Sequence, residues 1–138
     1  MKNIEYEYRN LPIPGGGYVT GVLFDQDREK VLYIRTDFGG CYRFSYENRH
    51  WDSLSESVNM FDLSETYPIA IATDLQQDET LYVISGINKE GTEGTFSISH
   101  DGGKTYTREM IPCFVHGNLN GRGTGYRLVQ NPKDKTTL

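Results

Sequence analysis

Long apolar runs, basic clusters and cysteine-rich motifs are all missing from this 138-residue sequence. No stretch approaches the ~20 apolar residues that a membrane-spanning helix requires, which excludes a helical membrane protein. The 14 Lys and Arg residues are outnumbered by 19 Asp and Glu, which gives a formal charge of −5. The sequence contains no cluster of basic residues that could bind a nucleic-acid backbone. We therefore expect neither nucleic acid nor membrane among the partners.

Metal and redox motifs are equally scarce. The two cysteines, Cys41 and Cys113, form no C-x-x-C pair and the three histidines are scattered, so we expect no metal site and no cofactor. We interpret both thiols as small buried hydrophobic groups. The first ten residues contain no apolar segment of the kind found in signal peptides, so the protein is expected to be cytoplasmic if Met1 is the native start.

The sequence is instead rich in glycine and tyrosine, with 15 Gly and 10 Tyr. Short β-branched or aromatic segments bounded by polar turns, a pattern typical of strands, lie at 18–24, 31–36, 69–73 and 81–85. No apolar period of 3.6 residues persists for three turns, and 53–65 is better interpreted as a long loop than as a helix. The sequence therefore predicts an all-β protein.

A ten-residue motif occurs three times, as LFDQDREKVL at 23–32, ATDLQQDETL at 72–81 and VQNPKDKTTL at 129–138. Each copy carries Asp or Asn at its third position and ends in Leu after a polar turn. The motif returns after 49 and then 57 residues. Four short strands in each ~50-residue repeat are typical of the blades of a β-propeller.

The repeat gives a division into blades. We assign blade one to about 15–54, blade two to about 68–112 and the start of a third blade to about 123–138. Closed propellers need at least about four blades, and these residues supply about two and a half. We therefore expect a truncated part of a larger propeller that needs the remaining blades, in cis or by oligomerisation.

An Asp-box turn is recognisable in blade two. The segment SHDGGKTY at 99–106 matches S-x-D-x-G-x-T-[WYF], in which the Asp side chain accepts hydrogen bonds from the amides of its own turn and glycine takes a positive φ. We assign this structural role to Ser99, Asp101, Gly103, Thr105 and Tyr106. In blade one, 45–51 is a degenerate copy with Trp51 at the position of Tyr106, and both aromatics are expected to pack between blades.

The loops of a four-stranded antiparallel blade divide between two faces. The Asp-box turns and the turns of the ten-residue motif share one face. The other face receives the segments 15–17, 37–40, 52–68, 87–93 and 116–123. Because loops on a rigid scaffold usually carry function, we place the candidate site on this second face.

Asp37 is the candidate catalytic residue on that face. It lies outside the Asp-box of its own blade, at the end of a predicted strand, in a turn so tight that two glycines follow. The alternative interpretation is a carboxylate that only bonds its own turn.

Three segments resemble, in this order and spacing, the N-terminal part of glycoside hydrolase family 74: GGGYVTG at 15–21, LYIRTDFGGCYRF at 32–44 and GNLNGRGTGYRLVQNP at 117–132. The resemblance covers about residues 12–138. It implies an extracellular xyloglucanase, or an oligoxyloglucan reducing-end-specific enzyme, built from two seven-bladed propellers with a substrate cleft between them. Such enzymes hydrolyse the β-1,4-glucan backbone of xyloglucan with inversion, using two aspartates.

The resemblance implies that Asp37 is the general base of that pair and activates water. Inversion needs two carboxyl groups about 6.5–9.5 Å apart, and the partner acid is implied to lie in the second propeller. Substrate-binding roles are assigned to Gly16, Gly17, Arg35, Gly39, Tyr42, Asn118 and Arg122. We expect Asn118 and Arg122 on the same face as Asp37, where their donors and acceptors suit sugar hydroxyls.

The sequence departs from the family pattern at three positions: Tyr126 replaces a glutamate, Cys41 an alanine and Phe44 a tryptophan. The expected substrate is therefore xyloglucan or a related polysaccharide. Two alternatives remain open, namely a non-catalytic Asp-box propeller module that binds glycan or protein, and a structural or assembly propeller. We predict no hydrolysis by residues 1–138 alone. In a complete enzyme, Asp37→Ala and Asp37→Asn should each abolish turnover with stability nearly unchanged.

Overall fold

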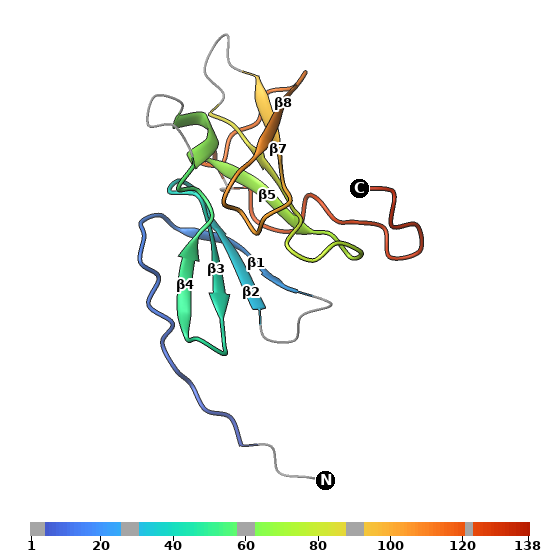
Figure 1. Cartoon of the computed structure of the whole chain (residues 1–138). Helices are drawn as coiled ribbons and strands as arrows, with labels where there is room; N and C mark the ends of the chain where they lie inside the picture. The colour runs from blue at the N-terminus through green and yellow to red at the C-terminus, as the bar shows by residue number, and fades with distance from the viewer. Residues whose placement is uncertain (1–4, 26–30, 58–62, 88–92, 121–122) are drawn as a thin grey trace.

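The computed structural model describes residues 5–25, 31–57, 63–87, 93–120 and 123–138. Two four-stranded antiparallel sheets follow one another along the chain (Figure 1). The first contains β1 (Val19–Phe24), β2 (Val31–Thr36), β3 (Cys41–Ser45) and β4 (His50–Ser53). The second contains β5 (Pro68–Thr73), β6 (Leu81–Ser85), β7 (Gly94–Ser99) and β8 (Thr107–Ile111), preceded by the short 3₁₀ helix η1 (Leu63–Thr66). The prediction of an all-β chain with propeller-like sheets is confirmed.

The two sheets repeat each other in register. In the first, Val19 pairs with Thr36, and the register shifts between Val19 and Gly21. In the second, Pro68 pairs with Ser85, and the same irregularity recurs between Pro68 and Ala70. These positions of β5 and β6 lie 49 residues after their counterparts in β1 and β2, so the spacing of the sequence motif is also the spacing of this pair of strands.

The same backbone hydrogen bond closes all three copies of the ten-residue motif. The amide of its third residue donates to the carbonyl of its ninth, from Asp25 to Val31 at 3.1 Å and from Asp74 to Thr80 at 3.1 Å. The equivalent bond from Asn131 to Thr137 is 2.8 Å long. The motif therefore encodes one local turn, whatever surrounds it.

No strand lies within 123–138, so the strand expected to begin blade three is not formed there. In both described sheets the strand before the motif's turn pairs with the strand after it. The segment instead bonds to the β5–β6 turn through Gln130. Its side-chain oxygen accepts from the Leu75 amide, and its Nε2 donates to Asp74 Oδ2 at 3.2 Å.

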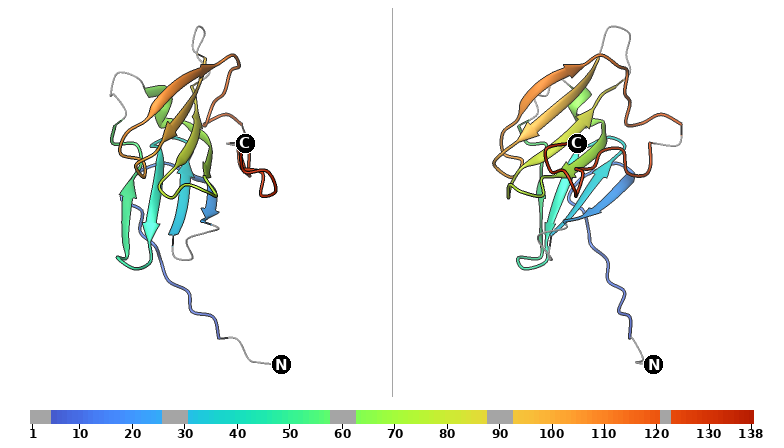
Figure 2. Two further views of the ribbon diagram at one scale, coloured as in Figure 1. Left: turned by 45° about the vertical axis from the view of Figure 1, so that its right-hand side comes forward. Right: turned by 90° about the vertical axis from the view of Figure 1, so that its right-hand side faces the viewer.

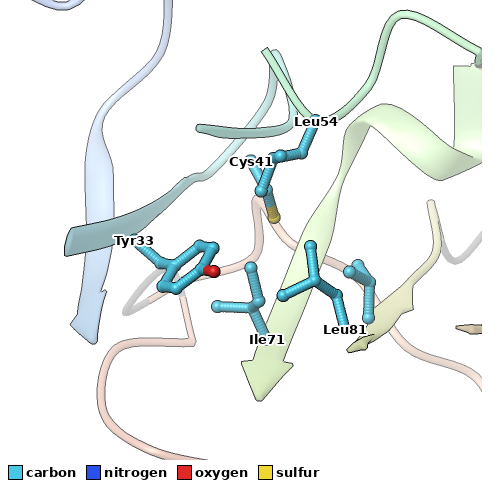
Figure 3. Packing of buried hydrophobic residues seen from close by; sticks show 6 residues of the cluster. Tyr33, Cys41, Leu54, Ile71 and Leu81 are labelled. Atoms are coloured by element: carbon cyan, nitrogen blue, oxygen red, sulfur yellow. The ribbon is translucent and has the colours of Figure 1, made fainter. Parts of the chain in front are cut away.

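The core between the sheets is apolar and closely packed. Figure 2 shows the two twisted sheets lying against each other as neighbouring blades, and Figure 3 shows the side chains that meet between them. The buried members of this cluster are Tyr33, Cys41, Leu54, Ile71, Leu81 and Val83. Tyr33 and Leu81 are completely inaccessible to solvent. Burial of apolar area at this contact fixes the position of one sheet on the other.

The opposite face of the first sheet carries a second cluster, made of Leu32, Ile34, Tyr42, Phe44 and Trp51. Ile13, from the N-terminal segment, packs against it. Trp51 faces away from the second sheet, so its expected packing between blades remains a prediction about a blade on the other side of the first sheet. Tyr106 does pack against the core between the two sheets, and its hydroxyl donates to the Leu54 carbonyl at 2.9 Å.

The two cysteines differ in environment. Cys41 is buried between the sheets, and burial raises the pKa of its thiol to about 12. Cys113 is exposed, because it follows β8, the edge strand of the second sheet, so the expectation of two buried thiols holds only for Cys41.

The turn between β7 and β8 is held by one carboxylate. Asp101 accepts hydrogen bonds from the amides of Lys104 and Thr105 at 3.1 and 2.9 Å, and from Thr105 Oγ1 at 2.6 Å. Ser99 Oγ donates to Asp101 and accepts from the Gly103 amide, each at 2.8 Å. Since Thr105 belongs to the turn, β8 begins only at Thr107.

We predict that Leu81→Ala lowers the free energy of unfolding by about 2–5 kcal/mol, because it opens a cavity at a fully buried site between the sheets. Urea denaturation of the chain measures this. Val22→Ala is the control, because Val22 is 44% exposed and its truncation should change stability by under about 0.5 kcal/mol. Equal losses in the two variants would contradict the packing described here.

A second prediction concerns acid stability. The hydrogen bonds from Thr105 hold the pKa of Asp101 well below its usual range. The ionised carboxylate thus stabilises the fold above its ordinary pKa, and this contribution is lost as the pH falls through the lower folded value. We expect Asp101→Asn to lower Tm at neutral pH and to lower it less with increasing acidity. Glu109→Gln, which removes a charge from the exposed strand β8, is the control. The Tm difference between this variant and the unaltered chain should not shrink in acid in the same way.

Candidate functional site

Two glycine-rich segments meet at the end of β2. The turn after β2 contains Gly39 and Gly40 at φ of 105° and 95°, a conformation that only glycine adopts easily. Gly17, at φ of 100°, lies so close to this turn that a Cβ on it would stand 2.1 Å from the Phe38 carbonyl oxygen. The segments 15–17 and 37–40, separate in the sequence, therefore form one rim of the molecule.

Asp37 lies in this rim and is only 2% exposed. Its Oδ1 accepts hydrogen bonds from the Tyr18 amide at 2.7 Å and from the Phe38 amide at 2.9 Å. Its own amide donates to the Tyr18 carbonyl at 2.9 Å. The carboxylate is thus fixed in direction by backbone donors from both segments.

These bonds change one expectation. Asp37→Ala would leave the Tyr18 and Phe38 amides without their acceptor, so it cannot leave stability nearly unchanged. Asp37→Asn keeps an oxygen that can accept both bonds. Only the asparagine variant separates the chemistry of Asp37 from its role in the turn.

Two further segments reach the same rim. The amides of Gly39 and Gly40 both donate to the Thr66 carbonyl, at 2.8 and 3.1 Å, which ties the β2–β3 turn to the residues leading from η1 into β5 (Figure 1). After β8, Gly117 donates to the Gly86 carbonyl at 3.3 Å, and a Cβ on it would stand 2.9 Å from the Asp37 carbonyl oxygen. The structure therefore brings four segments of both sheets together around Asp37.

Asn118 is exposed beside this contact, with its amide donating to His116 Nδ1 at 2.9 Å. Gly16 and Gly17 are also exposed, and nothing lies within 4 Å of a Cβ on Gly16. These three predicted binding residues are open to a ligand. Arg122 lies outside the described residues.

Arg35 is buried, and its guanidinium is occupied by protein acceptors. Its guanidinium donates to Thr20 Oγ1 at 2.7 Å and to the carbonyls of Gly123 and Gly125 at 2.8 and 2.7 Å. Burial lowers its pKa. We therefore assign Arg35 a positioning role, in which it anchors the segment that follows Asn118.

Tyr42 likewise supports the rim from beneath. It is 6% exposed, and its hydroxyl donates to the Gly39 carbonyl at 3.0 Å. Gly15 lies directly over it, because a Cβ there would overlap the Tyr42 hydroxyl. Burial raises the pKa of this phenol.

Sequence reasoning missed a row of three rings at this rim: Phe38, Tyr67 and His116. The ring centroids of Phe38 and Tyr67 are 6.5 Å apart, and those of Tyr67 and His116 are 5.7 Å apart. Phe38 was within reach of a sequence argument, because it directly follows Asp37. Tyr67 and His116 join it only through the packing of the second sheet against the first.

The described residues contain no group of three or more His, Cys, Asp or Glu side chains that could hold a metal ion. No helix in the same part of the chain has the length and apolar character needed to cross a membrane.

Comparison with known proteins gives a consistent result, although no family model matches the chain. It is 33% identical over 137 residues to a xyloglucanase of Paenibacillus sp., covering 96% of this chain and 13% of that enzyme. The crystal structure of a GH74 xyloglucanase from Xanthomonas campestris matches with a TM-score of 0.79 and 32% identity, over 95% of this chain and 19% of that one. The GH74 enzyme of Niastella koreensis matches with a TM-score of 0.75 and 31% identity, over 89% of this chain and 18% of that one.

We predict that Arg35→Gln loosens the 123–127 segment. Each lost bond from the charged guanidinium should cost about 1.5–3 kcal/mol. Hydrogen exchange at the amides of this segment should accelerate before any change in the core. Arg127→Gln is the matched control, since Arg127 donates to the same Gly123 carbonyl, at 3.1 Å, from an exposed position. Equal exchange rates in the two variants would contradict the positioning role.

Proposed function

This chain is homologous to the xyloglucanases of glycoside hydrolase family 74 (GH74) along nearly its whole length, and we propose that it carries the general base of an inverting xyloglucan-degrading enzyme. The observation that carries the proposal is the placement of Asp37. It directly follows β2 in the R-T-D-x-G-G motif, with its carboxylate oriented by two backbone amides. Four segments of both sheets converge on it.

The proposed reaction is a single displacement. Asp37 accepts a proton from a water molecule as that water attacks the anomeric carbon, while a carboxylic acid protonates the leaving oxygen on the other side. Because the Tyr18 and Phe38 amides already fix the carboxylate, little reorganisation is needed when the water binds. The family resemblance implies that the acid belongs to a second propeller facing this rim.

The substrate we propose is the β-1,4-glucan backbone of xyloglucan or a related polysaccharide. Gly16 and Gly17 present an exposed backbone without side chains, which allows a polymer to approach Asp37 closely. Asn118 offers a donor and an acceptor for hydroxyl groups, and Arg122 is proposed to add planar donors. Since such a polymer is found outside cells, we also propose an extracellular site of action.

The proposal assigns the remaining parts of the site to further propeller blades. The chain spans less than a fifth of the length of the proteins compared above. We propose that residues 15–54 and 68–112 are two blades of a propeller, with 123–138 leading into a third. Because the acid comes from outside these blades, residues 1–138 alone should release no reducing sugar from xyloglucan.

The test is Asp37→Asn within a complete two-propeller polypeptide. We expect release of reducing sugar from xyloglucan to fall by about 10²–10⁴-fold. Tm should stay nearly constant, because asparagine keeps the acceptor oxygen. Asp37→Ala should lose activity and, in addition, about 1–3 kcal/mol of stability for each unpaired amide. Asp52→Asn, on the partly exposed strand β4, is the control and should leave turnover unchanged.

One observation favours a second candidate, a non-catalytic module that binds glycan or protein. The bonds of Asp37 to the Tyr18 and Phe38 amides are also what a purely structural turn would require. Asp37→Asn separates the two candidates. Hydrolysis close to that of the unaltered enzyme would remove the catalytic role and leave the binding module.

A further inference from the structure

The three rings at the rim come from three different elements. Phe38 belongs to the β2–β3 turn, Tyr67 immediately precedes β5, and His116 follows β8. The Phe38 and Tyr67 rings are tilted by 37°, and the His116 ring meets Tyr67 edge to face at 72°. The row therefore runs from the first sheet to the second along the rim that holds Asp37.

The backbone beneath each ring is fixed. The turn of Phe38 bonds to the Thr66 carbonyl, next to Tyr67 in the chain. The Tyr67 carbonyl accepts from the Gly86 amide at 3.1 Å, and His116 forms an antiparallel bridge with Ile87. A binding surface on such anchored backbone needs no ordering when a ligand arrives.

The exposure of Phe38 does not suit a packing role. Its side chain is 47% exposed, whereas Phe44, on the apolar face of the same sheet, is 5% exposed. Tyr67 and His116 are half-buried and support Phe38 from the side of the second sheet. An aromatic ring held at the surface beside a fixed carboxylate offers a flat apolar area to a ligand.

We propose that Phe38, Tyr67 and His116 form one wall of a pyranose-binding subsite next to Asp37. The proposal deepens the proposed function and rests on it for the identity of the ligand. A β-linked glucose ring carries its hydroxyl groups around its edge and presents C–H groups on both faces. Such a face stacks on the Phe38 ring, while the hydroxyl edge meets the polar groups of the rim, including Asn118. The edge-to-face contact with His116 holds the Tyr67 ring in position. The held Tyr67 ring then restricts movement of the sugar along the rim.

The test is an amide NMR titration of the 138-residue chain with two probes, cellotetraose and a xyloglucan heptasaccharide. We expect binding in the millimolar range, with shifts confined to the amides of 15–18, 37–40, 67 and 116–118. A response to both probes would indicate recognition of the glucan backbone. A response to the heptasaccharide alone would indicate that its xylosyl branches take part. No response at saturating concentrations of either probe would overturn the subsite.

The variants separate stacking from folding. Phe38→Ala alters an exposed ring, so the chain should fold, and its Kd should rise by about 2- to 12-fold. Tyr67→Phe keeps the ring and should bind like the unaltered chain, whereas Tyr67→Ala should bind more weakly. Tyr46→Ala is the matched control, because this ring is 44% exposed at the other end of the sheet. Unchanged binding by Phe38→Ala would overturn the proposal.

Asp37→Asn distinguishes the two proposals. If it binds both probes normally and is inactive in the complete enzyme, both proposals stand. If it is active while Phe38→Ala binds poorly, the general base is wrong and the subsite stands. If it is inactive while Phe38→Ala binds normally, the base stands and the subsite is wrong.

Discussion

The structure depends on a close approach of backbone to backbone at the end of β2. Gly17 can lie against the Phe38 carbonyl only because it has no side chain, and Gly39 and Gly40 supply the left-handed turn that brings this carbonyl there. The approach places the Tyr18 and Phe38 amides on one oxygen of Asp37. Glycine placement therefore brings these two backbone donors onto the carboxylate of Asp37.

The same approach links the two sheets. Thr66 accepts from both glycines of the turn, and Gly117 fits against the Asp37 carbonyl, so the rim contains residues that precede and follow the second sheet. The apolar core of Tyr33 and Leu81 lies below it and holds the sheets in the position that these contacts require. A rigid rim on a packed core is the arrangement in which backbone donors can hold a reactive group at little cost on ligand binding.

Local features of the fold were predictable from the sequence, and features that depend on neighbours were not. The hydrogen bond that closes the ten-residue motif recurs in all three copies, since it joins two residues of the motif itself. The strand expected in blade three is not formed within 123–138, because strand formation depends on neighbouring strands as well as on the motif. Cys113, expected to be buried, is exposed for a related reason. The sequence pattern marks a residue as aromatic or apolar but does not say which sheet face or edge it occupies.

The candidate site divides in the same way. The glycine spacing around Asp37 could be read from the sequence because it follows from backbone sterics within one turn. Arg35 was expected to face a ligand, since its type suits sugar hydroxyls. Its guanidinium instead lies under the rim, bonded to the Gly123 and Gly125 carbonyls some 90 positions away in the chain. No local pattern reports a contact of that separation.

The internal repeat shows which part of the rim is scaffold. Positions 18 and 37 of the first sheet correspond, 49 residues later, to Tyr67 and Gly86 in the second. The Asp37 amide donates to the Tyr18 carbonyl just as the Gly86 amide donates to the Tyr67 carbonyl, so both blades close the end of their second strand with the same backbone bond. The carboxylate is present in the first blade and replaced by hydrogen in the second. The backbone bond is common to both blades, and what Asp37 adds to the first blade is a carboxylate at the rim that also accepts from the Tyr18 and Phe38 amides.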